Sequence, residues 1–304
     1  TTGHGLPFGD LWKFTADGRA VARVTLGMFP ASLQVSPDGR WVYVANFNLH
    51  GEMVPTSVSI VAADEMVEVA RPETCTMPHG SRFNAAGTRH YSTCMMDDLL
   101  VEIDATKLEV SRKLGLNTAN GEQRTAAGAN SQPSTDHAAH ATTGARCSPT
   151  WAVPTPNGRS VFVACNATND IVEVDTDAWK VTRRIPAGPG VYNLGISHDG
   201  TRLIGTNKKG QSVAVFDVAS GRELARIATL RRAVHGVAVS GDDRYAFISV
   251  EGYGAEPGTV EMIDLAALKR VASVDVGQMA AGIEVYPAPC AQRRAAGSPR
   301  WLVR

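Results

Sequence analysis

Two His-Gly pairs carry the side chains of this sequence that are best suited to chemistry. They are His79-Gly80 and His235-Gly236, and each stands at the start of a short run of alternating apolar residues. Imidazole titrates near neutral pH and offers a nitrogen lone pair, so these histidines could ligate a metal, hold a haem-like cofactor, or act as acid and base. The alternative is a structural role, in which each imidazole bonds a backbone carbonyl where its strand begins.

Methionines and further histidines extend the set of candidate metal ligands. Met77 comes just before His79, Met95 follows in the same repeat unit, and His137 and His140 have a spacing that places two imidazoles on one side of a helical turn. Methionine with histidine suits copper better than calcium or magnesium. Copper or a haem-like cofactor is therefore a hypothesis, set against the commoner roles of methionine as a core filler and of such histidines in a solvated loop.

An internal repeat supplies the elements that must position these residues. Each copy contains an alternating strand, a turn and a second strand, and the five copies span 31–46, 79–94, 150–165, 192–207 and 235–250. A third and a fourth strand follow each copy. Four antiparallel strands in about 42 residues are typical of one blade of a β-propeller.

A sixth unit is divided between the two ends of the chain. Residues 281–286 and 300–304 have the pattern of first and second strands, whereas 11–18 and 20–26 match third and fourth strands. Pairing the two ends in one blade would close the ring and leave no free edge strand. The sequence thus predicts an all-β propeller over residues 1–304 as a single domain, with six blades favoured over seven.

The blade sequences resemble the YVTN-repeat family of bacterial β-propellers, a group that includes cytochrome-D1-like and lactonase-like propellers. The match rests on the ends of four second strands: YVAN at 43–46, YSTC at 91–94, FVAC at 162–165 and IGTN at 204–207. It covers most of the chain outside 115–146. The resemblance implies the propeller fold but no single function, since such propellers serve as enzymes, cofactor holders and binding scaffolds.

Superposing the copies on their turns places the candidate site at one face of the disc. The equivalent positions expected around the mouth of the central channel are Ala31, His79, Thr150, Tyr192, His235 and Ala281. His79 and His235 belong to the second and fifth units, so a six-fold ring would oppose them across the channel. The expected ligand-binding set is His79, Arg82, Thr150, Tyr192, Asn193, Lys208, His235 and Glu251.

Four cysteines gather on the same face in this superposition. Cys94 and Cys165 end second strands, and Cys75 and Cys147 precede first strands by nearly the same offset. In an exported protein we expect two disulfides, either within each blade (Cys75 with Cys94, Cys147 with Cys165) or across the blade boundary. A thiolate metal site is the weaker alternative because no C-x-x-C spacing is present.

One segment, 115–146, interrupts the repeat. It is polar, rich in Ala, Gly, Ser and Thr, and without apolar periodicity. Such a composition is typical of a flexible flap, which we expect on the channel face.

Composition and missing motifs exclude several classes of function. Thirty basic and thirty acidic residues among 304 give no formal net charge, so nothing indicates a nucleic-acid partner, and no apolar run approaches the length of a membrane span. The sequence also lacks a Walker loop, a dinucleotide fingerprint, a nucleophile elbow and a C-x-x-C-H motif. Because the sequence opens at Thr1 without an initiator Met, we expect a periplasmic or secreted protein whose signal peptide has been removed.

Three functions are compatible with these features. The favoured one is an exported binding or assembly protein whose channel face and flap bind a small ligand or a periplasmic protein partner. The second is a copper- or haem-dependent oxidoreductase that uses His79 and His235, by analogy with the propellers of periplasmic nitrite reductases and nitrous oxide reductases. The third is a lactonase or lyase in which histidine is acid and base, and it would turn over without a redox change.

Overall fold

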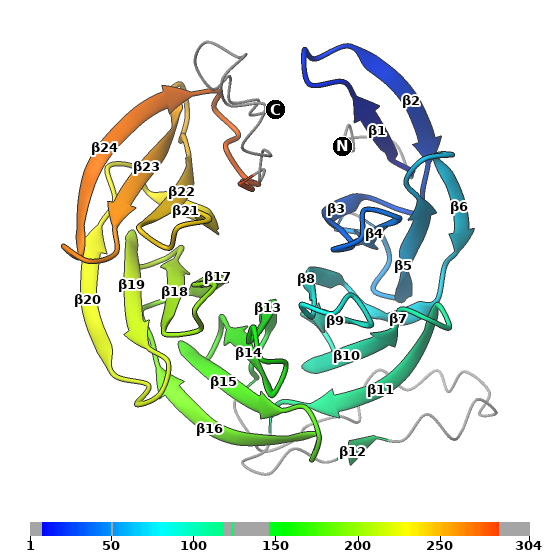
Figure 1. Cartoon of the computed structure of the whole chain (residues 1–304), viewed down its shortest axis with the longest axis horizontal. Helices are drawn as coiled ribbons and strands as arrows, with labels where there is room; N and C mark the ends of the chain where they lie inside the picture. The colour runs from blue at the N-terminus through cyan, green and yellow to red at the C-terminus, as the bar shows by residue number, and fades with distance from the viewer. Residues whose placement is uncertain (1–7, 50, 118–122, 125–145, 286–304) are drawn as a thin grey trace.

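Antiparallel β-strands and their connections make up the described part of the protein. The computed structural model describes residues 8–49, 51–117, 123–124 and 146–285. Figure 1 shows the sheets arranged around a common centre, with the first strand of each sheet innermost. No helix among the described residues is long and apolar enough to cross a membrane. The expected all-β, propeller-like architecture is confirmed.

Five sheets follow the predicted order of four strands from the channel outward. Blade 1 contains β3 (Pro30–Val35), β4 (Trp41–Asn46), β5 (Pro55–Ala62) and β6 (Val67–Ala70). Blade 2 contains β8 (Pro78–Phe83), β9 (Arg89–Cys94), β10 (Leu99–Asp104) and β11 (Glu109–Gly115). Blade 3 contains β13 (Pro149–Pro154), β14 (Ser160–Cys165), β15 (Asp170–Asp175) and β16 (Lys180–Pro186). Blade 4 contains β17 (Val191–Ile196), β18 (Arg202–Asn207), β19 (Ser212–Asp217) and β20 (Glu223–Ala228). Blade 5 contains β21 (Ala233–Val239), β22 (Tyr245–Glu251), β23 (Gly258–Asp264) and β24 (Lys269–Val276).

Two short strands extend these sheets, and a further pair stands apart. β7 (Glu73–Thr76) pairs with β5, and β12 (Gln123–Arg124) pairs with β11. β1 (Asp10–Phe14) and β2 (Ala20–Thr25) form a separate two-stranded sheet. This pair is where the sequence places the third and fourth strands of a sixth blade. Residues 281–285 form no strand, contrary to the expectation for 281–286, and 300–304 lie outside the described residues.

The hydrophobic core lies between adjacent blades. Strand side chains alternate between the two faces of a sheet, so each blade presents one apolar face to each neighbour. The interface of blades 2 and 3, for example, buries Tyr91, Leu114, Val163 and Trp179 in one cluster. Second strands such as β4, β9, β14 and β18 are buried along almost their whole length. A blade is a single sheet and cannot bury its own two apolar faces. Packing against the neighbouring blades therefore stabilises it.

Arginines on two fourth strands bind adjacent blades together at the outer side. Arg112 of β11 pairs with the buried Glu102 of β10, and its Nη1 also donates to the Thr176 carbonyl of blade 3 at 3.0 Å. Arg183 of β16 repeats this arrangement: it pairs with Glu173 and donates to two carbonyls of blade 4. Each guanidinium thus satisfies a carboxylate of its own blade and backbone acceptors of the next.

Two disulfides join the four cysteines. Cys75 is bonded to Cys94, and Cys147 to Cys165. This pairing, one of those left open by the sequence, is therefore confirmed, and the free-thiolate metal site is wrong for these four residues. The expectation that both bonds lie within one blade holds for Cys147–Cys165, whereas Cys75 lies on β7, which pairs with β5, so Cys75–Cys94 joins the sheets of blades 1 and 2. Cys94 and Cys165 end β9 and β14 as predicted. The fifth cysteine, Cys290, lies outside the described residues.

The insertion begins later than the predicted boundary of 115. Gly115 is the last residue of β11, and Leu116 is buried in the core between blades 2 and 3. The apolar alternation of the fourth strand continues through Leu116, which explains why the strand does not stop where the repeat pattern fades. Most of the insertion, with His137 and His140, lies outside the described residues, so its role as a flap stays a prediction.

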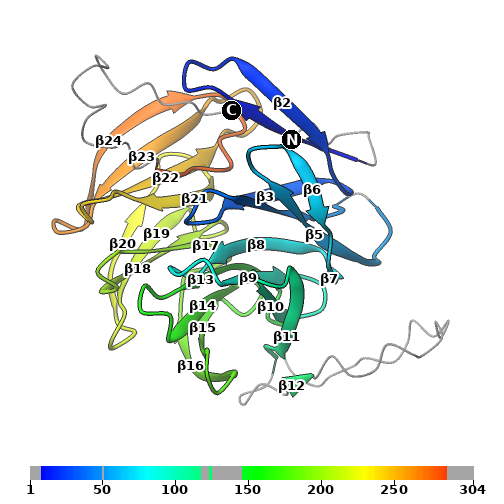
Figure 2. The same cartoon turned by 45° about the vertical axis from the view of Figure 1, so that its right-hand side comes forward.

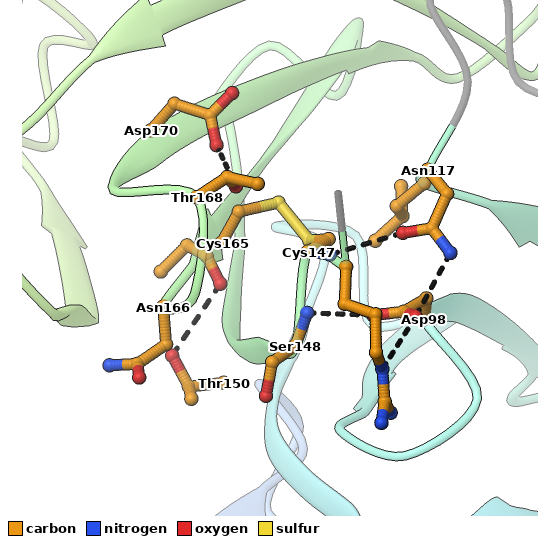
Figure 3. Close-up of a disulfide and its surroundings, with 12 residues drawn as sticks. Asp98, Asn117, Cys147, Ser148, Thr150, Cys165, Asn166, Thr168 and Asp170 are labelled. Atoms are coloured by element: carbon orange, nitrogen blue, oxygen red, sulfur yellow. Dashed lines mark hydrogen bonds and ion pairs between the residues drawn. A yellow bond between two sulfur atoms is a disulfide. The ribbon is translucent and has the colours of Figure 1, made fainter. Parts of the chain in front are cut away.

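Asp98 joins the two ends of this insertion. Its carboxylate accepts a hydrogen bond from Asn117 Nδ2 at 2.9 Å and another from the backbone N–H of Ser148 at 2.7 Å, and it lies 3.3 Å from Arg146 Nε (Figure 3). Asn117 Oδ1 in turn accepts from the backbone N–H of Cys147 at 3.0 Å. One buried carboxylate therefore holds the residues just before and just after the insertion side by side.

We predict that Arg112→Ala lowers the free energy of unfolding by about 3 kcal/mol, because it leaves the buried Glu102 with Arg89, 3.4 Å away, as its remaining cationic partner. The matched control is Arg226→Ala, which breaks a pair with Glu223 on the same strand and should cost at most about 1 kcal/mol. Urea unfolding measures both. Equal losses would contradict the account of the outer arginines.

Candidate functional site at the channel mouth

Each innermost strand has a β-bulge at the position that the superposition of repeats selects. The pairing of first with second strands shifts between Pro30 and Ser32, Pro78 and Ser81, Pro149 and Trp151, Val191 and Leu194, and Val234 and Val237. A bulge leaves a residue out of the ladder and redirects its side chain. His79, Thr150, Tyr192 and His235 all lie inside these bulges. The sequence repeat therefore identified a repeated irregularity of the backbone.

Hydrogen bonds from each blade to the next hold these bulges in place. Four bulge carbonyls accept from side chains of the preceding blade: Ser32 Oγ donates to the His79 carbonyl, His79 Nδ1 to Thr150 (2.7 Å), Thr150 Oγ1 to Tyr192 (2.6 Å) and Thr206 Oγ1 to His235 (2.9 Å). In the same way Ser249 Oγ of blade 5 donates to the carbonyl of Ala281, which lies outside a strand, at 2.7 Å. We call these five contacts the inter-blade carbonyl bonds. They satisfy acceptors that would otherwise be buried without a partner.

His79 is buried, and both of its ring nitrogens are engaged. Nδ1 lies 2.7 Å from the Thr150 carbonyl oxygen, and Nε2 lies 2.9 Å from the Tyr192 hydroxyl. A carbonyl can only accept, so Nδ1 carries the proton and Nε2 accepts from the tyrosine. The rings of Phe47 and Trp151 pack edge-on against the imidazole, with centroids 4.8 and 5.7 Å away. The hydrogen bond from His79 to a backbone carbonyl is the contact expected if this histidine has a structural role.

Tyr192 lies between the two histidines. Its ring centroid is 5.4 Å from that of His79 and 4.7 Å from that of His235. The strands that carry the histidines, β8 and β21, lie on opposite sides of the common centre (Figure 1). The bulges thus bring side chains of blades 2, 4 and 5 into one aromatic cluster, and a tyrosine ring occupies the place between the imidazoles.

A charged group lies on the other side of this cluster. Glu251 Oε1 is 3.6 Å from His235 Nε2, and its Oε2 is 3.5 Å from Lys208 Nζ. The Lys208 ammonium is also 4.7 Å from the centroid of the Tyr192 ring, within the range of a cation–π contact. All three charged or polar side chains are partly exposed, Lys208 the most. They form the part of the predicted site that a molecule in solution can reach.

Burial keeps both histidines neutral at physiological pH. It lowers the pKa of His79 to about 4, helped by the charge of Lys208 and opposed by the hydrogen bond to Thr150. The pKa of His235 falls to about 3, again first through burial and then through Lys208 and His79, against a backbone interaction with Ala281. Burial and the Glu251 carboxylate raise the pKa of Tyr192. The cluster therefore consists of uncharged hydrogen-bonding rings.

Arg82 lies deeper and contacts a different acidic residue. Its guanidinium carbon is 5.1 Å from the centroid of the Trp151 ring, and its Nη2 is 3.8 Å from Glu284 Oε2. Burial lowers the pKa of Arg82, and Glu284 opposes that effect. Arg82 is thus apart from the Lys208–Glu251 group in its contacts, although the sequence placed both on one rim.

Two other predicted rim residues are buried parts of the framework. Thr150 donates to the Tyr192 carbonyl, and the backbone N–H of Asn193 donates to Thr206 Oγ1 at 3.0 Å. Neither side chain reaches the surface. Their polar side chains suggested a rim, but Thr150 is bonded to the next blade and Asn193 is buried, so the expectation of direct ligand contact is not supported by their position.

The candidate metal ligands do not come together in the described part of the chain. Across residues 8–49, 51–117, 123–124 and 146–285, no three His, Cys, Asp or Glu side chains form a ligand set. Met77 is buried in a left-handed backbone conformation (φ 56°), and the backbone N–H of Met95 donates to its carbonyl. With both nitrogens of His79 engaged, the geometry of the described residues gives the copper or haem hypothesis no support.

Two aromatic residues at the site were missed from the sequence. Phe47 and Trp151 form the walls around His79. Trp151 directly follows Thr150, one of the equivalent mouth positions, and could have been predicted as a site residue for that reason. Phe47 comes just after the end of β4, where the repeat alignment stops, and no spacing pointed to it.

Comparison with known proteins establishes the fold alone. No protein-family model and no curated protein matches this chain. Among solved structures 1444 chains match, which marks the architecture as a common one. One of them, hydrazine synthase from Kuenenia stuttgartiensis, superposes with a TM-score of 0.60 at 20% identity, over 81% of this chain and 66% of that chain. The chain therefore spans just under two thirds of that structure, and the class of protein that is shown is a propeller-like all-β protein.

The lowered pKa values of the two histidines predict that stability falls with pH in a defined window. The unfolded chain takes up protons near pH 6.5, whereas folded His79 and His235 resist protonation until about 4 and 3. The contribution is complete above pH 6.5 and is lost as the pH drops from there toward 4. His79→Asn, whose amide can still donate to Thr150, should reduce this slope in urea unfolding from pH 7.5 to 4.5, while His235 and the buried His90, whose pKa also falls to about 3, maintain the rest.

The matched control for this slope is His198→Asn, a substitution at an exposed histidine. It should leave the slope in place. A His79→Asn variant with the unaltered slope would contradict the assignment of a buried neutral imidazole.

Proposed function

We propose that this chain is an exported binding protein whose channel mouth binds a small anionic ligand or an acidic group of a periplasmic protein partner. The observation that carries this proposal is the reachable group formed by Lys208, Glu251 and His235 beside the Tyr192 ring. The proposal includes a six-bladed ring closed by both ends of the chain and membership of the YVTN-repeat family. Two disulfides support export, since such bonds persist in oxidising compartments.

The chemistry of the reachable group favours a ligand with an anionic part and hydrogen-bonding groups. Lys208 supplies a cation, whose ammonium lies 4.7 Å from the centroid of the Tyr192 ring. Glu251 and the neutral His235 supply acceptors close by. A ligand carboxylate or phosphate would compete with Glu251 for the ammonium, which gives discrimination by charge as well as by shape.

Acid–base catalysis by the histidines is less well supported than binding. A general acid or base works best when its pKa lies near the working pH. The pKa values of His79 and His235 are instead about 4 and 3, and Nε2 of His79 already accepts a hydrogen bond from Tyr192. Neither His79 nor His235 is therefore suitably poised for the lactonase or lyase alternative.

The proposal predicts that Lys208→Met weakens ligand binding at least tenfold, which corresponds to about 1.4 kcal/mol. Calorimetric titration with a panel of small carboxylates and phosphates identifies the ligand and measures this change. Lys209→Met is the matched control, because Lys209 is the exposed next residue and should change affinity little.

Two results would contradict the proposal. One is equal weakening in both lysine variants, and the other is a panel in which no anion binds at millimolar concentration. One equivalent of copper or a haem-like absorption band in the purified protein would support the oxidoreductase hypothesis instead.

A further inference from the structure

The sheet β1–β2 has the geometry of the outer half of a blade. Its pairing runs from Asp10 opposite Thr25 to Phe14 opposite Ala20, with a register shift between Lys13 and Phe14. The pair β19–β20 of blade 4 has the same shift, between Val215 and Phe216. Phe14 is thus equivalent to Phe216. Among the described residues, β1 pairs only with β2, whereas β19 also pairs with β18 on its inner side.

Side chains next to that free edge are exposed where their counterparts are buried. Phe14 is 46% exposed, whereas Phe216 is fully buried. On the first strand of blade 1, Leu33 is also 46% exposed, although its counterpart Ala152, which occupies the same place in the ladder of blade 3, is fully buried. Apolar exposure therefore concentrates on both walls of the place where a second strand belongs.

The last described residues already occupy the innermost position of the same blade. The Ala281 carbonyl accepts from Ser249 Oγ, as the first-strand carbonyls of the other blades do from their preceding neighbours. Ile283 lies against blade 5, since a Cβ added to Gly236 would be 3.0 Å from its Cγ2. Figures 1 and 2 show this segment running inward between blade 5 and β1. One strand position, between 281–285 and β1, is left to fill.

We propose that residues 300–304 of this chain fill it as the second strand, with Leu302 opposite Phe14. The sequence RWLV at 300–303 corresponds to RWVY at 40–43, which leads into the second strand β4. In blade 4 the equivalent pair is Leu203 opposite Phe216. Val303 then faces Lys13. The fourteen residues from 286 to 299 connect segment 281–285 to this second strand. At about 3.3 Å per residue their reach is ample.

Disulfide trapping tests this register. In a Cys290→Ser background, the full chain with Phe14→Cys and Leu302→Cys should form an intramolecular disulfide under mild oxidation, detected by peptide mass mapping. The matched off-register chain, with Phe14→Cys and Val303→Cys, should link at least fivefold less. The native disulfides, Cys75–Cys94 and Cys147–Cys165, serve as internal standards for digestion.

A second measurement keeps the proposal testable if Phe14→Cys disturbs the sheet. In the chain ending at Pro299, backbone amides of Asp10–Phe14 should exchange with deuterium at least tenfold faster than in the full chain. Equal linking in both cysteine pairs, linking between two molecules only, or unchanged exchange overturns the proposal. The inference rests on the closed ring of the proposed function and gives its register, but not on ligand binding at the channel mouth, which calorimetric titration tests separately.

Discussion

The inter-blade carbonyl bonds at the channel mouth are the interaction on which the rest of the site depends. The first strands of blades 2 to 5 bulge, and each of these bulges leaves a carbonyl that its own blade does not satisfy. A hydroxyl or imidazole of the preceding blade supplies the donor. Because an unsatisfied buried acceptor costs about 1–3 kcal/mol, the bulges and the contacts between blades stabilise one another. The positions of His79, Thr150 and Tyr192 follow from this mutual dependence.

This constraint divides the mouth into a framework and a reachable part. His79 is held by Thr150 on one side and Tyr192 on the other, which fixes its tautomer and occupies both nitrogens. Tyr192 then presents its ring to Lys208 and His235. Within the described part of the mouth, a ligand can meet the charged group beyond the tyrosine. His79 is thus a positioning residue, and Lys208 is the residue through which binding is proposed.

Much of the architecture could be predicted because local sequence patterns determine the strands and turns of each blade. Alternating strands and Gly-containing turns recur along the chain, and a repeat cannot bury its faces without neighbours, so blades and their order follow. The positions of Cys94 and Cys165 at strand ends followed from the same alignment, but the choice between the open pairings depends on three-dimensional distance. The register of β11 through Gly115 was missed because polar composition, which marks the insertion, sets in only after Leu116.

The sequence predicted which residues belong to the site better than it predicted how they are arranged. Alignment found His79, Tyr192 and His235 at one structural position, but a bulge changes the direction of a side chain without leaving a mark in the sequence. A rim that included Thr150 and Asn193 was inferred from position alone, and so was the place between the histidines that Tyr192 fills. Burial then decides chemistry, since a pKa of about 4 for His79 depends on packing by Phe47 and Trp151 that no motif shows.

The most direct test of this account is the protonation state of His79, read by nitrogen-15 NMR of histidine-labelled protein. The account predicts a neutral ring with the proton on Nδ1, a slowly exchanging Nδ1–H resonance, and no titration between pH 5.5 and 8, since the pKa lies near 4. Comparison with His79→Asn assigns the signal. A ring protonated on Nε2, or one that titrates near pH 6.5, would contradict the inter-blade bond to Thr150 and the framework built on it.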